Sequence, residues 1–184
     1  MEIEFVGAQI PPDPTTKYLI VDLFGNNLLI TVNNFLKICD PTYIQTSVTD
    51  TSLKLDYKGS KLFRVVKNLG IFGGDIIKND GTSGESIYGM VFRDENFAIM
   101  HDSRYLISAT KPLNTPHTTN SQFMITLGAL PWLDFRYQVF GRIRSTSRSL
   151  VDYIEFFAGT TDWDKKELPF YDVRIKNCYL TAPA

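Results

Sequence analysis

Short, largely apolar runs separated by polar and glycine-rich turns recur along the chain and predict β-strands. Eight such runs cover residues 3–6, 18–24, 62–66, 97–100, 106–109, 123–127, 139–143 and 172–180. Helical spacing occurs twice. The first helix is predicted to extend to Cys39 with Thr31 as its cap, because Val32, Phe35 and Leu36 recur at that spacing. The second is predicted over residues 149–157.

About eight strands with two helices predict a mainly β protein, a closed β-barrel capped by two α-helices. No repeat or linker interrupts the 184 residues, so we expect a single domain over residues 1–184. Residues 40–56 are polar and lack a clear period, which predicts a long loop or a small hairpin. Turns are predicted at the Pro-rich residues 11–16 and at residues 79–81.

Composition and motifs argue against several functions, namely binding of nucleic acid, nucleotides or metals and spanning of a membrane. With 19 basic and 20 acidic residues, the net charge of −1 gives no electrostatic case for nucleic acid as a partner. No apolar run is long enough to predict a membrane span. The glycine-rich residues 70–84 match no nucleotide-binding motif. His101 and His117 have no ligand or base partner at useful spacing, so no metal or cofactor is expected and a structural or exposed role is favoured for both.

The cysteines Cys39 and Cys178 are too far apart in sequence to suggest a disulfide framework, and both are interpreted as buried thiols. No secretory signal pattern opens the chain. A soluble, intracellular protein is therefore expected, cytoplasmic or cytoskeletal rather than secreted.

Several motifs then recur in a characteristic order. The chain reads FRVVKNLGIFGGD over residues 63–75, FRDENF over 92–97, NSQFMI over 120–125, WLD over 132–134 and VFGRI over 139–143. In this order and spacing the set resembles the cyclophilin family of peptidyl-prolyl isomerases, from about residue 18 to residue 180. The resemblance implies an antiparallel barrel with a helix at each end, and a groove that binds Pro-containing peptide segments.

The resemblance also implies site residues. Arg64 matches the catalytic arginine, which donates a hydrogen bond towards the prolyl nitrogen while the amide twists. The glutamine that grips the substrate backbone matches Gln122, the rim tryptophan matches Trp132, and the apolar wall after it matches Leu133. From the residues alone, Arg64 could equally be an ordinary strand arginine and Trp132 a packing aromatic.

Other groove positions depart from the family pattern. The expected phenylalanine and methionine are Leu69 and Gly70, and the glutamine that supports the arginine is Phe72. Two further aromatic positions carry Met124 and Tyr137. The segment that binds the substrate backbone falls near Thr110 and Lys111, beside a small insertion. These changes remove rigid walls and a supporting group, which predicts weakened catalysis.

Two segments exceed the family's usual length or add aromatics, residues 40–56 and residues 160–171 with Trp163 and Phe170. Each is interpreted either as a docking element or as a self-packed surface loop. The leading hypothesis is a divergent cyclophilin-fold protein, a structural or accessory subunit of a larger assembly with weak or lost isomerase activity. The alternatives are an active isomerase that assists folding and a non-catalytic binder of Pro-containing segments.

Overall fold

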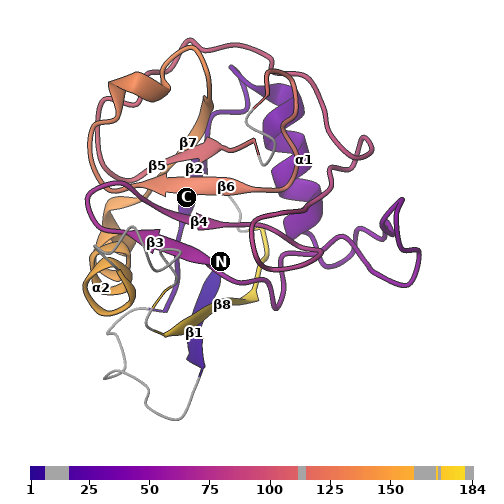
Figure 1. The fold of residues 1–184 in the computed structure, drawn as a ribbon, viewed down its shortest axis with the longest axis horizontal. Coiled ribbons are helices and arrows are strands. Elements are labelled where there is room, and N and C mark those ends of the chain that lie inside the picture. The colour runs from indigo at the N-terminus through magenta and orange to yellow at the C-terminus, as the bar shows by residue number, and fades with distance from the viewer. Residues whose placement is uncertain (7–16, 112–114, 160–168, 170, 181–184) are drawn as a thin grey trace.

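The described residues form eight strands and two α-helices, as the sequence predicts for a mainly β protein (Figure 1). The computed structural model describes residues 1–6, 17–111, 115–159, 169 and 171–180. The strands are β1 (Glu2–Val6), β2 (Val21–Leu23), β3 (Arg64–Val66), β4 (Gly70–Gly73), β5 (Leu106–Ala109), β6 (Phe123–Thr126), β7 (Gln138–Ile143) and β8 (Asp172–Asn177). The helices are α1 (Leu29–Cys39) and α2 (Arg148–Ala158), with 3-10 turns η1 (Pro131–Leu133) and η2 (Ser145–Ser147).

Every strand pairing is antiparallel. Six strands form one sheet in the order β2-β7-β5-β6-β4-β3, and β1 pairs with β8 in a second sheet. Isolated bridges between Glu2 and Tyr18 and between Lys61 and Arg174 connect the two sheets at both edges. The strands therefore surround one core, although the expected barrel is not one continuous ladder.

An aromatic cluster fastens α1 to the sheet. The ring of Phe35 on α1 lies 5.1 Å from Tyr57, 5.8 Å from Phe123 and 5.3 Å from Phe140, measured between ring centroids. All four side chains are buried. Aromatic pairs at these separations add to the free energy of burial, so the cluster fixes where α1 lies against β6 and β7. In Figure 1, α2 lies on the opposite side of the strands.

The start of α1 differs from the prediction. The helix begins at Leu29, so Thr31 lies inside it and is not its cap. The carboxylate of Glu95 caps the helix instead, accepting hydrogen bonds from the backbone N–H groups of Ile30 (2.9 Å) and Thr31 (2.7 Å). A carboxylate is favoured there by the unpaired amides and the helix dipole. Sequence spacing could not reveal a cap that comes from 64 residues away.

One predicted strand is absent, and one observed strand was not predicted. Residues 97–100 form no strand, because the Asn96 side chain accepts a hydrogen bond from the N–H of Ala98 and turns the chain there. β4 was not predicted, because Gly70 and Gly73 weaken the strand signal. Its pairing with β3 and β6 compensates for the low propensity.

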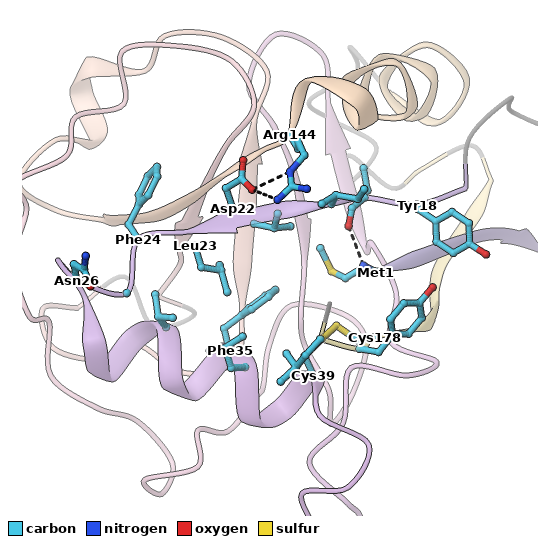
Figure 2. Close-up of a pocket in the computed structure, with 18 of the residues that line it drawn as sticks. Met1, Tyr18, Asp22, Leu23, Phe24, Asn26, Phe35, Cys39, Arg144 and Cys178 are labelled. Carbon is cyan, nitrogen blue, oxygen red and sulfur yellow. Dashed lines mark hydrogen bonds and ion pairs between the residues drawn. A yellow bond between two sulfur atoms is a disulfide. The ribbon is translucent and has the colours of Figure 1, made fainter. Parts of the chain in front are cut away.

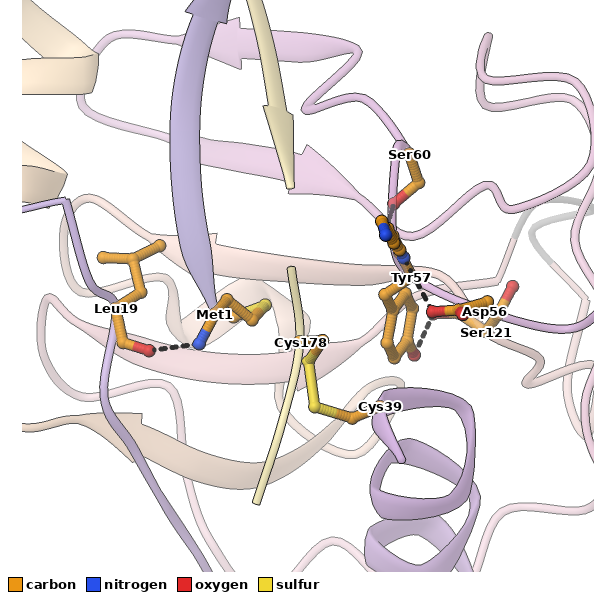
Figure 3. Close-up of a disulfide and its surroundings, with 9 residues drawn as sticks. Met1, Leu19, Cys39, Asp56, Tyr57, Ser60, Ser121 and Cys178 are labelled. Atoms are coloured by element: carbon orange, nitrogen blue, oxygen red, sulfur yellow. Dashed lines mark hydrogen bonds between the residues drawn. A yellow bond between two sulfur atoms is a disulfide. The ribbon is translucent and has the colours of Figure 1, made fainter. Parts of the chain in front are cut away.

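The prediction of buried thiols is also wrong, because Cys39 and Cys178 form a disulfide. Figure 2 and Figure 3 show the bond between the last turn of α1 and the chain just after β8. The Cα atoms are 4.9 Å apart although 139 residues separate them in sequence. That proximity follows from the aromatic docking of α1 and the pairing of β8, and neither was visible in the cysteine spacing.

Residues 40–56 form a small hairpin, one of the two predicted alternatives. The backbone N–H of Ser47 donates to Leu53, that of Leu55 donates to Gln45, and the buried Glu85 carboxylate accepts bonds from Ser47. Burial acts to raise the pKa of Glu85, but hydrogen bonds from hydroxyl and amide groups of the hairpin leave that pKa below its usual range.

The Pro-rich residues 11–16 and the aromatics Trp163 and Phe170 lie outside the described residues, so those predictions stay untested. Within the described ranges, no helix is long and apolar enough to cross a bilayer.

Reduction of the disulfide should destabilise the fold by about 2–4 kcal/mol, because the bond closes a long loop and limits the entropy of the unfolded chain. Urea unfolding with and without dithiothreitol measures the difference. The double variant Cys39→Ser/Cys178→Ser should match the reduced protein and ignore the reductant. An unchanged midpoint for the wild-type chain on reduction would contradict the prediction.

Candidate functional site

All ten site residues predicted from the sequence line one cavity of about 350 Å³, called the groove below. They come from six parts of the chain that the sheet brings together. The lining comprises Arg64, Leu69, Phe72, Thr110, Lys111, Gln122, Met124, Trp132, Leu133 and Tyr137, with Phe63 and Gly81 in addition.

The alternation of β6 places two of these side chains. Phe123 and Ile125 face the core, so Gln122 and Met124 take the opposite face and line the groove. The side-chain amide of Gln122 donates to the carbonyl oxygens of Gly81, at 3.0 Å, and Ser83. The loop at residues 77–83 therefore holds Gln122 in place and fixes the direction of its side-chain amide.

Arg64 and Phe72 are directly opposed in the β3–β4 register. The guanidinium carbon of Arg64 lies 4.7 Å from the centroid of the Phe72 ring. This stacking is attractive, at about 0.5–1 kcal/mol for an exposed pair. The loss of the expected glutamine at position 72 therefore does not leave Arg64 without support. A ring holds the guanidinium by its face, however, and does not fix the direction of an N–H group as an amide would.

Gly70 and Met124 occupy a shared space. A Cβ atom added to Gly70 would lie 2.7 Å from Cγ and 2.8 Å from Sδ of Met124. The thioether thus fills the volume that a larger residue at position 70 would take. The groove keeps a wall there, but a flexible methionine supplies it from β6.

A buried ion pair holds the wall formed by Lys111. Its ammonium lies 2.7 Å from the carboxylate of Asp94 and 5.6 Å from the Tyr137 ring centroid, and the Lys111 side chain is only 6% exposed. Because Asp94 neutralises it, Lys111 adds little net charge to the groove. Burial raises the pKa of the Tyr137 hydroxyl, against the influence of Arg136, so Tyr137 stays neutral at pH 7. Beside them Thr110 Oγ1 is buried and has no hydrogen-bond partner among the described residues.

The buried carboxylate of Asp75 holds the loop at residues 77–83 in place. It accepts bonds from the Ser83 hydroxyl (2.5 Å) and from several backbone amides of residues 77–83. Burial acts to raise the pKa of Asp75, but these hydrogen bonds leave it below its usual range. Gly74 must be glycine, because its φ is +84° and a Cβ would lie 2.4 Å from the Ser121 carbonyl.

His101 has the partner that sequence spacing did not reveal. Its Nδ1 lies 2.9 Å from the Asp134 carboxylate and its Nε2 lies 2.9 Å from the Ser108 hydroxyl, and the side chain is fully buried. The hydrogen-bonded series Ser108–His101–Asp134 has the connectivity of a catalytic triad. It cannot act as one here, because neither Ser108 nor His101 is accessible to solvent or substrate. The backbone of His101 also bonds to the residues on either side of η1. Its carbonyl accepts from the N–H of Leu130, and its N–H donates to the Asp134 carboxylate.

That network positions η1 at the groove rim. Trp132 is 60% exposed on η1, so it is a rim residue and not a packing aromatic of the core. Asp134 follows η1 directly, and its bond to His101 ties the turn to β5. The structural role favoured for His101 is thus compatible with its position, and it acts on the groove through the turn.

The antiparallel strands and the groove that contains Arg64 agree with what the resemblance to the cyclophilin family implied. The family model described as cyclophilin type peptidyl-prolyl cis-trans isomerase/CLD matches residues 14–180. The chain belongs to the cyclophilin-type family.

Relatives in this family carry differing names. The chain is 38% identical over 164 residues to the human (Homo sapiens) NK-tumor recognition protein, which covers 89% of this chain and 11% of that protein. It is 42% identical over 125 residues to the mouse (Mus musculus) probable inactive peptidyl-prolyl cis-trans isomerase-like 6, covering 68% and 38%. It is 35% identical over 158 residues to peptidyl-prolyl cis-trans isomerase 9 of Caenorhabditis elegans, covering 86% and 48%. The chain thus spans less than half of each of these relatives.

Sequence reasoning missed four supporting residues, namely Phe63, Asp75, Gly81 and Asp94. The turn at Gly81 was recognised, but its approach to the Phe63 ring was not. Asp75 and Asp94 do lie within the family-like motifs at residues 63–75 and 92–97. Those motifs suggested a structural role for them, but not which groups they contact.

Replacing His101 with glutamine should remove a pH dependence of stability. Burial lowers the pKa of His101 against the opposing effect of Asp134, so the folded state binds its proton less readily than the unfolded chain. His101 therefore costs no stability above the unfolded pKa, about 6.5, and destabilises the fold as the pH falls below it. Between pH 7.5 and 5.5 we expect a loss of about 1 kcal/mol in the wild type that is absent in His101→Gln.

Urea unfolding at the two pH values measures this difference. Equal slopes for wild type and His101→Gln would show that His101 is not the titrating group.

Gly70 and Met124 should be energetically coupled. Gly70→Ala should cost about 1–3 kcal/mol through overlap with Met124, and most of that cost should vanish in a Met124→Ala background. A double-mutant cycle of unfolding free energies measures the coupling. Gly25→Ala is the control, because its added Cβ would meet only Val32 at 3.7 Å. Additive effects of the two substitutions would contradict the shared-space interpretation.

Proposed function

We propose that this domain binds Pro-containing segments in the groove with weak isomerase activity, and serves as an accessory part of a larger assembly. The observation that carries the proposal is the stacking of Arg64 on Phe72. The catalytic candidate remains in the groove, but an aromatic ring stands where the family pattern has the amide that supports it. Binding needs the walls, whereas catalysis needs a donor aimed at the twisted amide.

The retained groups support peptide binding. Gln122 is fixed by two carbonyl groups, and Trp132 offers an exposed ring at the rim. A proline ring needs apolar walls, and Leu69, Met124 and Leu133 supply part of them beside the aromatic rings of the lining. At positions 69 and 124, where the family pattern has phenylalanine, a flexible side chain replaces a rigid ring, so we expect affinity to be low.

An active isomerase is the second candidate, and one observation favours it. Met124 fills the space at Gly70, so the groove is not open where the sequence suggested a lost wall. The similarity to peptidyl-prolyl cis-trans isomerase 9 of Caenorhabditis elegans points the same way, and the similarity to the probable inactive mouse relative points the other.

An assembly role draws support from the surface hairpin at residues 40–56. Ile44 is 81% exposed and Val48 60% exposed on it, although Glu85 holds the hairpin in place. An ordered segment with apolar side chains in water suits a docking element. A soluble intracellular location remains a prediction, and the disulfide bears on it because such bonds persist mainly in oxidising compartments.

NMR exchange on an X-Pro peptide tests the catalytic part of the proposal. Relative to an ordinary family member measured beside it, we expect kcat/KM to be lower by about 30- to 1000-fold, which corresponds to about 2–4 kcal/mol of transition-state stabilisation. Phe72→Gln should raise kcat/KM by restoring an amide next to Arg64, and Arg64→Ala should abolish the remainder. An ordinary rate in the wild type that Arg64→Ala removes would establish the active isomerase instead.

Peptide titration followed by Trp132 fluorescence in a Trp163→Phe background tests binding separately. We expect a shift at millimolar peptide that Gln122→Ala weakens. No response at that concentration would refute groove binding, whatever the rate measurements give.

A further inference from the structure

Thr110 lies directly after β5, and its side chain is directed to the groove. Ala109 at the end of β5 is buried in the core, so the alternation of the strand places Thr110 on the opposite face. The ladder between β5 and β6 continues here, because the Thr110 N–H donates to the Gln122 carbonyl at 3.1 Å. Thr110 and Gln122 are therefore neighbours across the two strands, and both line the groove.

The hydroxyl group of Thr110 is buried with its hydrogen-bonding capacity unused. Thr110 is only 9% exposed, and no described residue bonds to its Oγ1. The polar groups beside it are already engaged. The side-chain amide of Gln122 donates to two backbone carbonyl groups, and the ammonium of Lys111 bonds to Asp94 and to one more backbone carbonyl.

A buried hydroxyl without a partner costs free energy, and valine has the same shape without that cost. Thr126 on β6 shows the usual arrangement, since its hydroxyl donates to the Ser103 carbonyl at 2.8 Å and accepts from the Leu106 N–H at 3.0 Å. The free fold gains nothing comparable from the hydroxyl at position 110. A polar group of this kind in a groove is explained most simply by a ligand that completes it.

The depth of the hydroxyl limits which ligand group can reach it. Rotation about the Cα–Cβ bond to another staggered position exchanges the Thr110 hydroxyl with the methyl group or the hydrogen, and so can turn the oxygen towards the cavity. The main chain of a bound segment lies further out, so a side chain has to project inwards. The cavity of about 350 Å³ must also hold the proline ring, which favours a short side chain. A serine hydroxyl is short and can both donate and accept.

We propose that Thr110 is a specificity-determining residue of the groove, and that it selects Pro-containing segments with a hydroxyl-bearing residue next to the proline. A segment with alanine at that place leaves the Thr110 hydroxyl unpaired. Sites with a buried group that only one ligand satisfies discriminate against the ligand that lacks the partner. The proposal rests on the peptide binding proposed above and adds the side chain that the groove prefers.

Titrations followed by Trp132 fluorescence in the Trp163→Phe background test the preference. The probes are three blocked peptides, Ala-Ser-Pro-Ala, Ala-Ala-Pro-Ser and Ala-Ala-Pro-Ala. At least one serine peptide should bind about 3- to 10-fold more tightly than the alanine peptide, as expected for one net hydrogen bond. The ratio should fall to about one in Thr110→Val and persist in Thr110→Ser, which keeps a hydroxyl.

Urea unfolding without peptide tests whether the hydroxyl is unpaired in the free protein. Thr110→Val should leave the midpoint unchanged or raise it, because no hydrogen bond is lost. Thr126→Val is the matched control and should lower the midpoint, because the same substitution there removes two hydrogen bonds.

The outcomes separate this proposal from peptide binding itself. Equal affinity for all three peptides would overturn the role of Thr110 and leave groove binding intact. A serine preference that survives in Thr110→Val would assign the selection to another residue. A lower midpoint for Thr110→Val would show that the hydroxyl is already bonded in the free protein. No binding of any peptide would refute groove binding, and the selectivity with it.

Discussion

Burial of Phe123 fixes the register of β6, and the groove depends on that register. The ring lies 5.8 Å from both Phe35 and Tyr57 in the aromatic cluster that fastens α1 to the sheet. Because successive side chains face opposite sides of a strand, this burial directs Gln122 and Met124 into the groove. A slip by one residue would place an amide in the core and a phenyl ring in the groove, at a large cost in free energy.

Substitutions in the groove act in compensating pairs. Phe72 replaces a supporting amide but stacks on Arg64, and Met124 fills the space left by Gly70. A comparison of single positions with the family pattern shows only the lost residues. The compensating contacts become visible only between strands, where Phe72 meets Arg64 and Met124 meets Gly70. What the pairs restore is volume and attraction. They do not restore the amide that the family pattern places beside the arginine, which is why the proposed function separates binding from catalysis.

Strand-like runs and helical spacing predicted most of the strands and both helices, and the resemblance to the cyclophilin family pointed to ten groove residues. Alternation records which side chains are buried, and the motifs around Arg64, Gln122 and Trp132 preserve their order along the chain. It missed β4, where the buried glycines Gly70 and Gly73 carry no strand signal. It could not decide the contacts that support those residues, because each joins distant segments.

By itself, then, the sequence determined the class of fold, and its resemblance to a family pointed to ten of the twelve residues that line the groove. Only the tertiary structure decided that Cys39 bonds to Cys178, that Glu95 caps α1 and that Asp134 binds His101. These partners are 139, 64 and 33 residues apart. Periodicity reports the environment of a residue within its own element, whereas the partner it meets depends on how the strands close around the core.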